Sequence, residues 1–282
     1  MINIEDITRA AKKLPPFPGV LERALRVLDD PEASVGEVIG IVEHDQAITA
    51  NVLRLCNSAY YGVSRKVRSL REALVLLGNA QLREVLLAGT LVKFLGTAVR
   101  GYDLAGGQLW RHAVATGLMA RVISKRVYGT EPPSLFTAAL LHDIGKVVLS
   151  EFVDQYLDKI MALVEAGQHS FSEAEGTLLG INHAQVGADV AESWNFPDEI
   201  VIAIRWHHSP ERASGDNGTT RMVHLANILT VSVGIGVGAD GLSCRGKQEV
   251  MESFGLKSRD LQEVMMTFYD TFRQAQEMLG LA

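Results

Sequence analysis

The sequence predicts an all-α fold, because signals for helix starts and stops recur along the chain and strand patterns are scarce. The one weak strand candidate, TVSVGIGVG at residues 230–238, is interpreted as the end of a buried helix that runs into a glycine-rich loop. The 282 residues are 47% hydrophobic and 21% charged, which is typical of a globular protein with one large or two modest domains.

Several helix boundaries can be predicted in chain order. Asp45 is placed as the N-cap of an amphipathic helix. Ser69 is placed as the next N-cap, with Glu72 as its capping-box partner and Gly78 as the stop. Pro197 falls in the first turn of a later helix. The last predicted helix aligns its apolar residues along one face: Leu261, Val264, Met265, Phe268 and Phe272.

Glycines near residue 101 predict a division of the chain into two lobes. Four of them interrupt two helical segments in LGTAVRGYDLAGGQLW, so we place an N-terminal lobe at 1–100 and a second lobe at 101–282. This connection is short and partly apolar, so we expect the lobes to pack together rather than swing freely. The polar stretch Ser209–Thr220 is predicted to be a surface loop.

Charge, cysteine content and hydropathy narrow the class of protein. A net charge of −6 and a pI of about 5.8 argue against a broad nucleic-acid surface. Cys56 and Cys244 cannot form a disulfide framework, which favours reduced thiols. The longest apolar stretch we identify, Ile228–Ala239, is too short and glycine-rich to span a bilayer core of ~30 Å. We therefore expect a cytoplasmic protein without nucleic-acid or membrane partners.

Histidines on apolar helical segments are the strongest functional signal in the second lobe. A lone histidine in such a position is more often a hydrogen-bonded core residue than a ligand. Burying several rings separately would require a separate partner for each, because unpaired buried polar groups cost several kcal/mol. Gathering them around metal ions satisfies many at once. The candidate ligands are His112, His142, Asp143, His183, His207 and His208.

The spacing of these residues constrains how they could meet. Neighbours on a helix point ~100° apart, so His142 and Asp143 serve one cluster most easily at a helix end or when Asp143 bridges two ions. Two ions ~3.5–4 Å apart with a hydroxide between them suit phosphoester hydrolysis. Imidazoles with a carboxylate favour zinc, iron, manganese or nickel over magnesium or calcium. Lys146 shares a face with Asp143 and could bind a phosphate oxygen, or neutralise Asp143 if no metal is present.

The remaining histidines are assigned ordinary roles. His44 precedes Asp45 in a second copy of the His-Asp dipeptide, and this copy is interpreted as structural because Asp45 suits an N-cap. His169 lies in a polar turn, and His224 lies in an apolar helical segment. Neither is included among the ligands.

Longer motifs carry a resemblance to a known family. LHDIGK at 141–146, with the histidines before and after it, is similar to the HD-domain superfamily of metal-dependent phosphohydrolases. The segment Leu14–Gly62, followed by SLREALVLLG and later by MVHLAN, resembles the HDOD (HD-related output domain) proteins over roughly residues 10–230. The resemblance implies an HD-like helical core with an N-terminal helical lobe packed against it, in a bacterial signalling module.

The chain departs from the catalytic members of the superfamily at three places. In this resemblance, Asn227 stands where HD hydrolases have a late aspartate. The segment after His208 lacks the glycine-tyrosine-proline of the related HD-GYP phosphodiesterases, and Gln108 stands where those enzymes tend to have a glutamate. Each change removes negative charge or substrate-contacting structure.

These features favour a cytoplasmic regulatory HDOD module that is catalytically weak or inactive and retains a metal-binding pocket. One or two ions of iron, zinc, manganese or nickel are the expected cofactors, and no residue is assigned a catalytic role. The expected partner is a signalling protein or a nucleotide second messenger. Two alternatives stay open: a metal-dependent phosphohydrolase acting on a nucleotide or cyclic dinucleotide, and a metal-free helical scaffold in which Lys146 pairs with Asp143.

Overall fold

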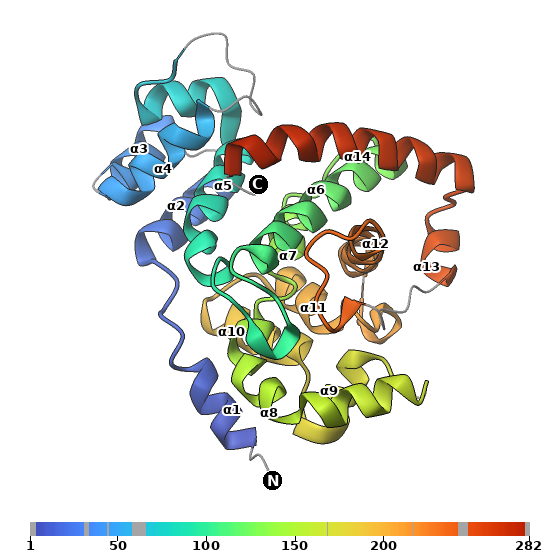
Figure 1. Ribbon diagram of the computed structural model, residues 1–282. Helices are drawn as coiled ribbons and strands as arrows, with labels where there is room; N and C mark the ends of the chain where they lie inside the picture. The colour runs from blue at the N-terminus through green and yellow to red at the C-terminus, as the bar shows by residue number, and fades with distance from the viewer. Residues whose placement is uncertain are drawn as a thin grey trace. The chain divides into compact units, whose positions relative to one another are not determined.

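A computed structural model describes residues 4–30, 34–43, 45–57, 66–167, 169–215, 217–241 and 248–279. This part of the chain consists of helices joined by turns and loops and contains no strand, so the all-α prediction is confirmed (Figure 1). An isolated antiparallel bridge joins Val99 to Leu104. The chain divides into two compact units: unit 1 comprises Met1–Pro15 and Phe94–Phe268, and unit 2 comprises Pro16–Lys93 and Tyr269–Ala282.

Unit 2 is built mainly from four helices: α2 (Gly19–Asp29), α3 (Val35–Val42), α4 (Gln46–Cys56) and most of α5 (Leu70–Leu95). The Asp45 side chain accepts a hydrogen bond from the Ile48 amide at 3.0 Å, which confirms the predicted N-cap of α4. His44 lies outside the described residues. The Ser69 hydroxyl likewise accepts a hydrogen bond from the Glu72 amide at 3.2 Å, which confirms the predicted N-cap. The Glu72 carboxylate accepts from the backbone amide of Arg68 at 2.9 Å, whereas a capping box would have it accept from the amide of Ser69.

Gly78 ends the first helical segment of α5, as predicted, and a second segment continues beyond it under the same label. The Gly78 backbone has φ 72° and ψ 176°, a left-handed conformation that kinks the helix. By length and composition alone, α5 is the one helix of the described chain that could cross a membrane. The longer segment beyond the kink, residues 79–95, is about 26 Å long at 1.5 Å per residue. This length is less than the ~30 Å thickness of a bilayer core.

Unit 1 contains the remaining helices. They are α1 (Ile4–Ala11), η2 (Arg100–Tyr102), α6 (Gln108–Tyr128), α7 (Leu135–Leu141), α8 (Gly145–Glu165), α9 (Phe171–Leu179), α10 (His183–Ser193), α11 (Asp198–Trp206), η3 (Pro210–Arg212), α12 (Gly218–Ser232) and α13 (Gln248–Ser253). The long α14 (Ser258–Leu279) begins in this unit. Helix α6 packs against α7 and α12, and α10 packs against α8 and α11 (Figure 1).

The observed units differ from the predicted division at 101. Gly101 lies inside unit 1, where its amide donates to the Ser150 hydroxyl at 3.2 Å. A Cβ at Gly101 would lie 2.2 Å from the Ser150 carbonyl oxygen, so this glycine permits close packing of η2 on α8. The end of α14 groups with unit 2, whereas the predicted second lobe includes it. The packing of one lobe against the other stays a prediction.

Two other sequence expectations are met in unit 1, the first to within one residue. Pro197 occupies the N-cap position of α11, directly before the first helical turn. Helix α12 ends at Ser232 and runs into a loop in which Gly234 and Gly236 have positive φ, as expected for residues 230–238. This loop returns to α6, because the Ile235 carbonyl lies 3.0 Å from the ring of His112.

Candidate metal centre

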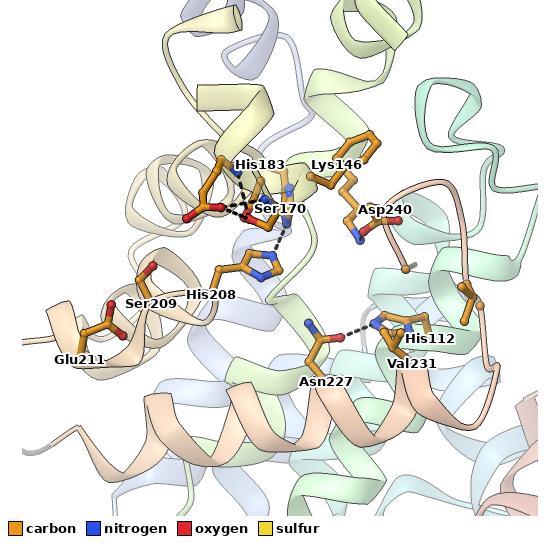
Figure 2. A pocket seen from close by; sticks show the side chains of 16 residues that line it. His112, Lys146, Ser170, His183, His208, Ser209, Glu211, Asn227, Val231 and Asp240 are labelled. Atoms are coloured by element: carbon orange, nitrogen blue, oxygen red, sulfur yellow. Dashed lines mark hydrogen bonds and ion pairs between the residues drawn. The ribbon is translucent and has the colours of Figure 1, made fainter. Parts of the chain in front are cut away.

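The structure brings the six predicted metal ligands together in unit 1. Most of them lie at or near helix ends, the position that adjacent residues need in order to serve one cluster. His142 and Asp143 occupy the turn between α7 and α8, and His183 is the first residue of α10. His207 and His208 directly follow α11, while His112 lies within α6. Figure 2 shows His112, His183 and His208 around one pocket.

Gly145 allows the turn that carries Asp143 to approach α10. A Cβ at this position would lie 1.9 Å from the His183 carbonyl oxygen and 2.6 Å from the Gly187 amide nitrogen. Any side chain here would push the first residues of α8 and α10 apart. The glycine of the LHDIGK motif thus has a packing role that brings Asp143 and His183 together.

The Asp143 carboxylate lies at the middle of the cluster and is 1% exposed. Its Oδ1 is 3.4 Å from His183 Nε2 and 3.7 Å from His207 Nε2. Its Oδ2 is 3.3 Å from His142 Nε2 and 3.6 Å from His112 Nε2. His208 joins through its Nε2, which is 2.9 Å from His183 Nε2. Asp143 therefore belongs to two candidate ligand groups, one with His112 and His142 and the other with His183, His207 and His208.

In four of the rings, Nδ1 faces away from Asp143 and lies within hydrogen-bond distance of an oxygen acceptor. His142 Nδ1 lies 2.7 Å from the Ala139 carbonyl oxygen, and His207 Nδ1 lies 2.7 Å from that of Ile204. Because a carbonyl oxygen can only accept, each Nδ1 carries the hydrogen, and Nε2 of the neutral ring keeps its lone pair. The same holds for His183 against the Glu175 carboxylate. His112 differs, because an oxygen lies 3.0 Å from each ring nitrogen: the Ile235 carbonyl oxygen from Nδ1 and Asn227 Oδ1 from Nε2. This outer hydrogen bond is typical of metal-binding histidines.

The ring nitrogens and carboxylate oxygens that face the middle of the cluster are better suited to binding a cation than to hydrogen-bonding one another. Nε2 of His142, Nε2 of His207 and Oδ1 of Asp143 are buried without a hydrogen-bond partner among the described residues. Unpaired buried acceptors are unfavourable and call for a proton or an ion. Two ligands of one ion, each ~2.0–2.2 Å away, are about 2.8–3.6 Å apart. The separations of 3.3–3.7 Å around Asp143 are close to this range.

The pKa shifts favour the ligand form of most rings. Burial, opposed by Asp143, lowers the pKa of His112 to about 4. Burial and the neighbouring rings also hold the pKa values of His207 and His208 well below the ordinary value. The pKa of His183 is raised, because Glu175 outweighs the effect of burial. Burial alone would raise the pKa of Asp143, but His142 and Lys146 hold it well below its usual range, so the carboxylate is ionised.

Lys146 is held between two carboxylates. Its Nζ donates to Asp143 Oδ2 and to Asp240 Oδ2, both at 2.6 Å, and the residue is 5% exposed. Burial opposes the charge, but the two aspartates raise the pKa of Lys146 above its ordinary value. The pairing with Asp143 is the contact expected of a metal-free centre. Asp240, which follows α12 in the glycine-rich loop, was not predicted, because no local spacing connects it to Lys146.

Asn227 lies in the cluster, as its comparison with the late HD aspartate implies. Its Oδ1 is 3.0 Å from His112 Nε2, a contact drawn in Figure 2. Gln108 instead acts locally at the start of α6, where its side-chain oxygen accepts from the Ala105 amide at 2.6 Å. His224 supports the centre indirectly, since its Nδ1 lies 2.7 Å from the His207 carbonyl oxygen.

Glu175 and Tyr102 form a second part of the site that sequence reasoning missed. Glu175 is fully buried, and its Oε2 accepts from the backbone amide of His183 at 3.0 Å and from its Nδ1 at 2.7 Å. The Tyr102 hydroxyl donates to Glu175 Oε1. A buried glutamate in an amphipathic helix was the available signal, because such a residue needs partners.

A pocket of about 280 Å³ opens beside the cluster (Figure 2). Ser209 and Glu211, from the predicted 209–220 loop, line it, and residues 210–212 of that loop form the short helix η3. Glu173 also lines the pocket. The ligand candidates reach it as well, together with the lysine and its partner: His112, His183, His208, Asn227, Lys146 and Asp240.

Comparisons with known proteins agree with this fold. The HDOD domain family matches residues 14–210. An uncharacterised protein of Treponema pallidum (strain Nichols) is 26% identical over 201 residues, which cover 70% of this chain. The match covers only 38% of that relative's own length.

Three solved structures share the fold, each at 24% identity and covering 98% of this chain. An HDOD domain protein of unknown function from Geobacter sulfurreducens has a TM-score of 0.76 with 99% of its chain covered. A candidate phosphohydrolase from Shewanella amazonensis SB2B has a TM-score of 0.73 with 97% of its chain covered. A candidate signal transduction protein from Marinobacter aquaeolei VT8 has a TM-score of 0.77 with 65% of its chain covered. Since the family match spans most of the sequence, the chain belongs to the HDOD domain family.

Proposed function

We propose that this chain is a bacterial signal-transduction module that binds one or two transition-metal ions and hydrolyses phosphoesters weakly or not at all. The observation that carries metal binding is the convergence of His142 Nε2, His207 Nε2 and Asp143 Oδ1 without hydrogen-bond partners in the described structure. Iron, zinc, manganese or nickel suits this donor set. Such ions would supply Lewis acidity toward phosphoryl oxygens when bound.

Weak catalysis is supported by the charges around the pocket. Lys146 is the only lysine or arginine among the described lining residues, and its ammonium group is already paired with two carboxylates. Glu173 and Glu211 add negative charge to the wall. Beside His112, Asn227 offers a neutral amide where HD hydrolases have an aspartate. A phosphate-bearing substrate would therefore find little cationic protein surface here, and phosphate binding by Lys146 would require displacement of Asp240.

We place the proposed module in the cytoplasm, with a signalling protein or a nucleotide second messenger as its partner. Cys56 is a buried free thiol, and burial raises its pKa to about 11, which keeps it unreactive. Cys244 lies outside the described residues. The acidic pI of about 5.8 supports partners other than nucleic acid.

A second candidate function is metal-dependent phosphoester hydrolysis. The specific observation that favours it is the sharing of Asp143 between two ligand groups, since a carboxylate between two ions is a common feature of such hydrolases. The substrate would then be a nucleotide or cyclic dinucleotide.

Elemental analysis of protein purified without a histidine tag tests the proposal. Protein prepared in metal-replete medium should carry between a fraction of an equivalent and ~2 equivalents of transition metal. The same preparation should show little hydrolysis of cyclic di-GMP or of bis(p-nitrophenyl) phosphate. A metal-free protein under these conditions would support the scaffold alternative. Rapid hydrolysis that disappears on chelation would support the phosphohydrolase.

A further inference from the structure

The two ligand groups around Asp143 are unequal in composition. The first, which we call the His142 half, contains His112, His142 and Asp143 Oδ2. The second, the His207 half, contains His183, His207, His208 and Asp143 Oδ1. The His207 half offers one more imidazole. Each additional neutral nitrogen ligand strengthens the binding of a borderline transition ion.

Charge near the carboxylate increases this difference. The Lys146 ammonium lies 2.6 Å from Asp143 Oδ2, the oxygen that faces the His142 half. A positive charge at this distance repels a cation bound to the same oxygen and neutralises part of the negative charge of the Asp143 carboxylate. The amide of Asn227, which contacts His112 in this half, is neutral and compensates for none of that repulsion.

The His207 half has a buried carboxylate behind it instead. His183 Nδ1 donates to Glu175 Oε2 at 2.7 Å, whereas the Nδ1 atoms of His142, His112 and His207 face neutral backbone carbonyls. A carboxylate acceptor makes an imidazole a more basic ligand and holds its orientation. The carboxylate is itself held in place, because the His183 amide and the Tyr102 hydroxyl both donate to it.

We propose that the two halves bind metal ions unequally, that the first ion occupies the His207 half, and that Glu175 is the positioning residue responsible for its tighter binding. This inference rests on the proposed metal binding. The His142 half then fills only at higher metal concentration, so the number of bound ions depends on the metal supply.

Titration of chelator-stripped, untagged protein with Co²⁺ tests the order of binding. Visible absorption reports the ligand environment, and competition with a chelator gives the affinities. The wild-type protein should bind a first equivalent at least about tenfold more tightly than a second, because outer carboxylates alone change affinity 10–100-fold. His208→Ala, at a partly exposed ligand, should remove the tight step. His142→Ala should remove the weak step and leave the tight one.

Glu175→Gln isolates the contribution of the carboxylate. Glutamine has nearly the same shape, its carbonyl oxygen can accept from the His183 amide and ring, and its NH₂ can donate to the Tyr102 hydroxyl. The first Co²⁺ should bind about 10–100-fold more weakly, with the second step unchanged. Glu165→Gln is the matched control, since this exposed residue lies about 28 Å along α8 from Lys146. It should alter neither step.

The outcomes separate this inference from the proposed function. Failure of the wild-type protein to bind Co²⁺ would overturn both. Two ions bound with equal affinity, or loss of the tight step in His142→Ala, would overturn only the inequality. If His142→Ala fails to fold by circular dichroism, Asn227→Asp gives a second measurement. It should tighten the weak step alone, and a change confined to the tight step would contradict the assignment.

Discussion

The chain contains the His-Asp dipeptide twice, and its two aspartates have different surroundings. Asp45 in unit 2 is partly exposed, and its carboxylate accepts a hydrogen bond from the Ile48 amide three residues later. Asp143 in unit 1 is 1% exposed and lies within 3.3–3.7 Å of four imidazole nitrogens, three of which come from distant parts of the chain. One carboxylate caps a helix, and the other is at the middle of a candidate metal centre.

The difference teaches that the dipeptide has no fixed chemical role. Asp45 is satisfied by a donor on its own helix, so its function depends on local sequence. The surroundings of Asp143 depend on Gly145, which lets α8 approach α10, and on rings presented by α6, α10 and the end of α11. Removing each aspartate should therefore affect different properties, and the following predictions are ordered from the largest expected effect to the smallest.

Asp143→Asn should remove most bound metal from both halves of the centre. The substitution keeps the side-chain volume but removes the charge that both ligand groups share, so we expect affinity to fall at least about 100-fold. Chelator competition and elemental analysis measure the loss. Asp45→Asn is the matched control, because asparagine is a good N-cap, and it should leave metal content unchanged. Wild-type metal content in Asp143→Asn would contradict the assignment of Asp143.

Acidification should destabilise the metal-free protein between about pH 6.5 and pH 4. The pKa of His112 is about 4 when folded and ~6.5 when unfolded, so the unfolded chain binds more protons in this window and stability falls with pH. Between pH 7 and pH 5 this amounts to about 2 kcal/mol for His112 alone. The lowered pKa values of His207 and His208 act in the same direction, and the raised pKa of His183 opposes them.

Urea denaturation of chelated protein at pH 7 and pH 5 measures this effect. His112→Gln should weaken the dependence, because the variant has lost one of the titrating rings. Equal or greater stability of the wild-type protein at pH 5 would show that these rings are protonated in the folded state.

Asn227→Asp should tighten metal binding by at least roughly tenfold. The new carboxylate would lie where the amide oxygen now lies, 3.0 Å from His112 Nε2, and charged ligands form stronger contacts than neutral ones. Cyclic di-GMP hydrolysis should stay weak, because the segment after His208 still lacks glycine-tyrosine-proline. A metal competition titration and a phosphodiesterase assay check both points. Asn195→Asp, at an exposed residue, is the control and should leave metal affinity unchanged. If Asn227→Asp also left the affinity unchanged, residue 227 would lie outside the ligand set.

Asp45→Ala should lower the free energy of unfolding by about 1 kcal/mol without changing metal content. The loss corresponds to the missing cap on the Ile48 amide. Urea denaturation measures it, and Asp45→Ser should recover most of the stability because serine also caps helices. A change in bound metal would mean that the two aspartates are not independent.

The sequence by itself determined the helical class, the Asp45 and Ser69 caps and the residue types of the candidate ligands. These depend on periodicity and on contacts a few residues apart, which spacing along the chain reveals. It also indicated that Asp143 could be shared, because adjacent residues at a helix end can face one cluster.

Only the tertiary structure decided which distant groups complete the centre. Lys146 pairs with Asp240 across 94 positions, and the Tyr102 hydroxyl meets Glu175 across 73. The division into units was equally non-local, since Met1–Pro15 groups with Phe94–Phe268. Such pairings arise because packed helices bring together side chains that have no fixed separation in sequence, and burial then requires each polar group to find a partner.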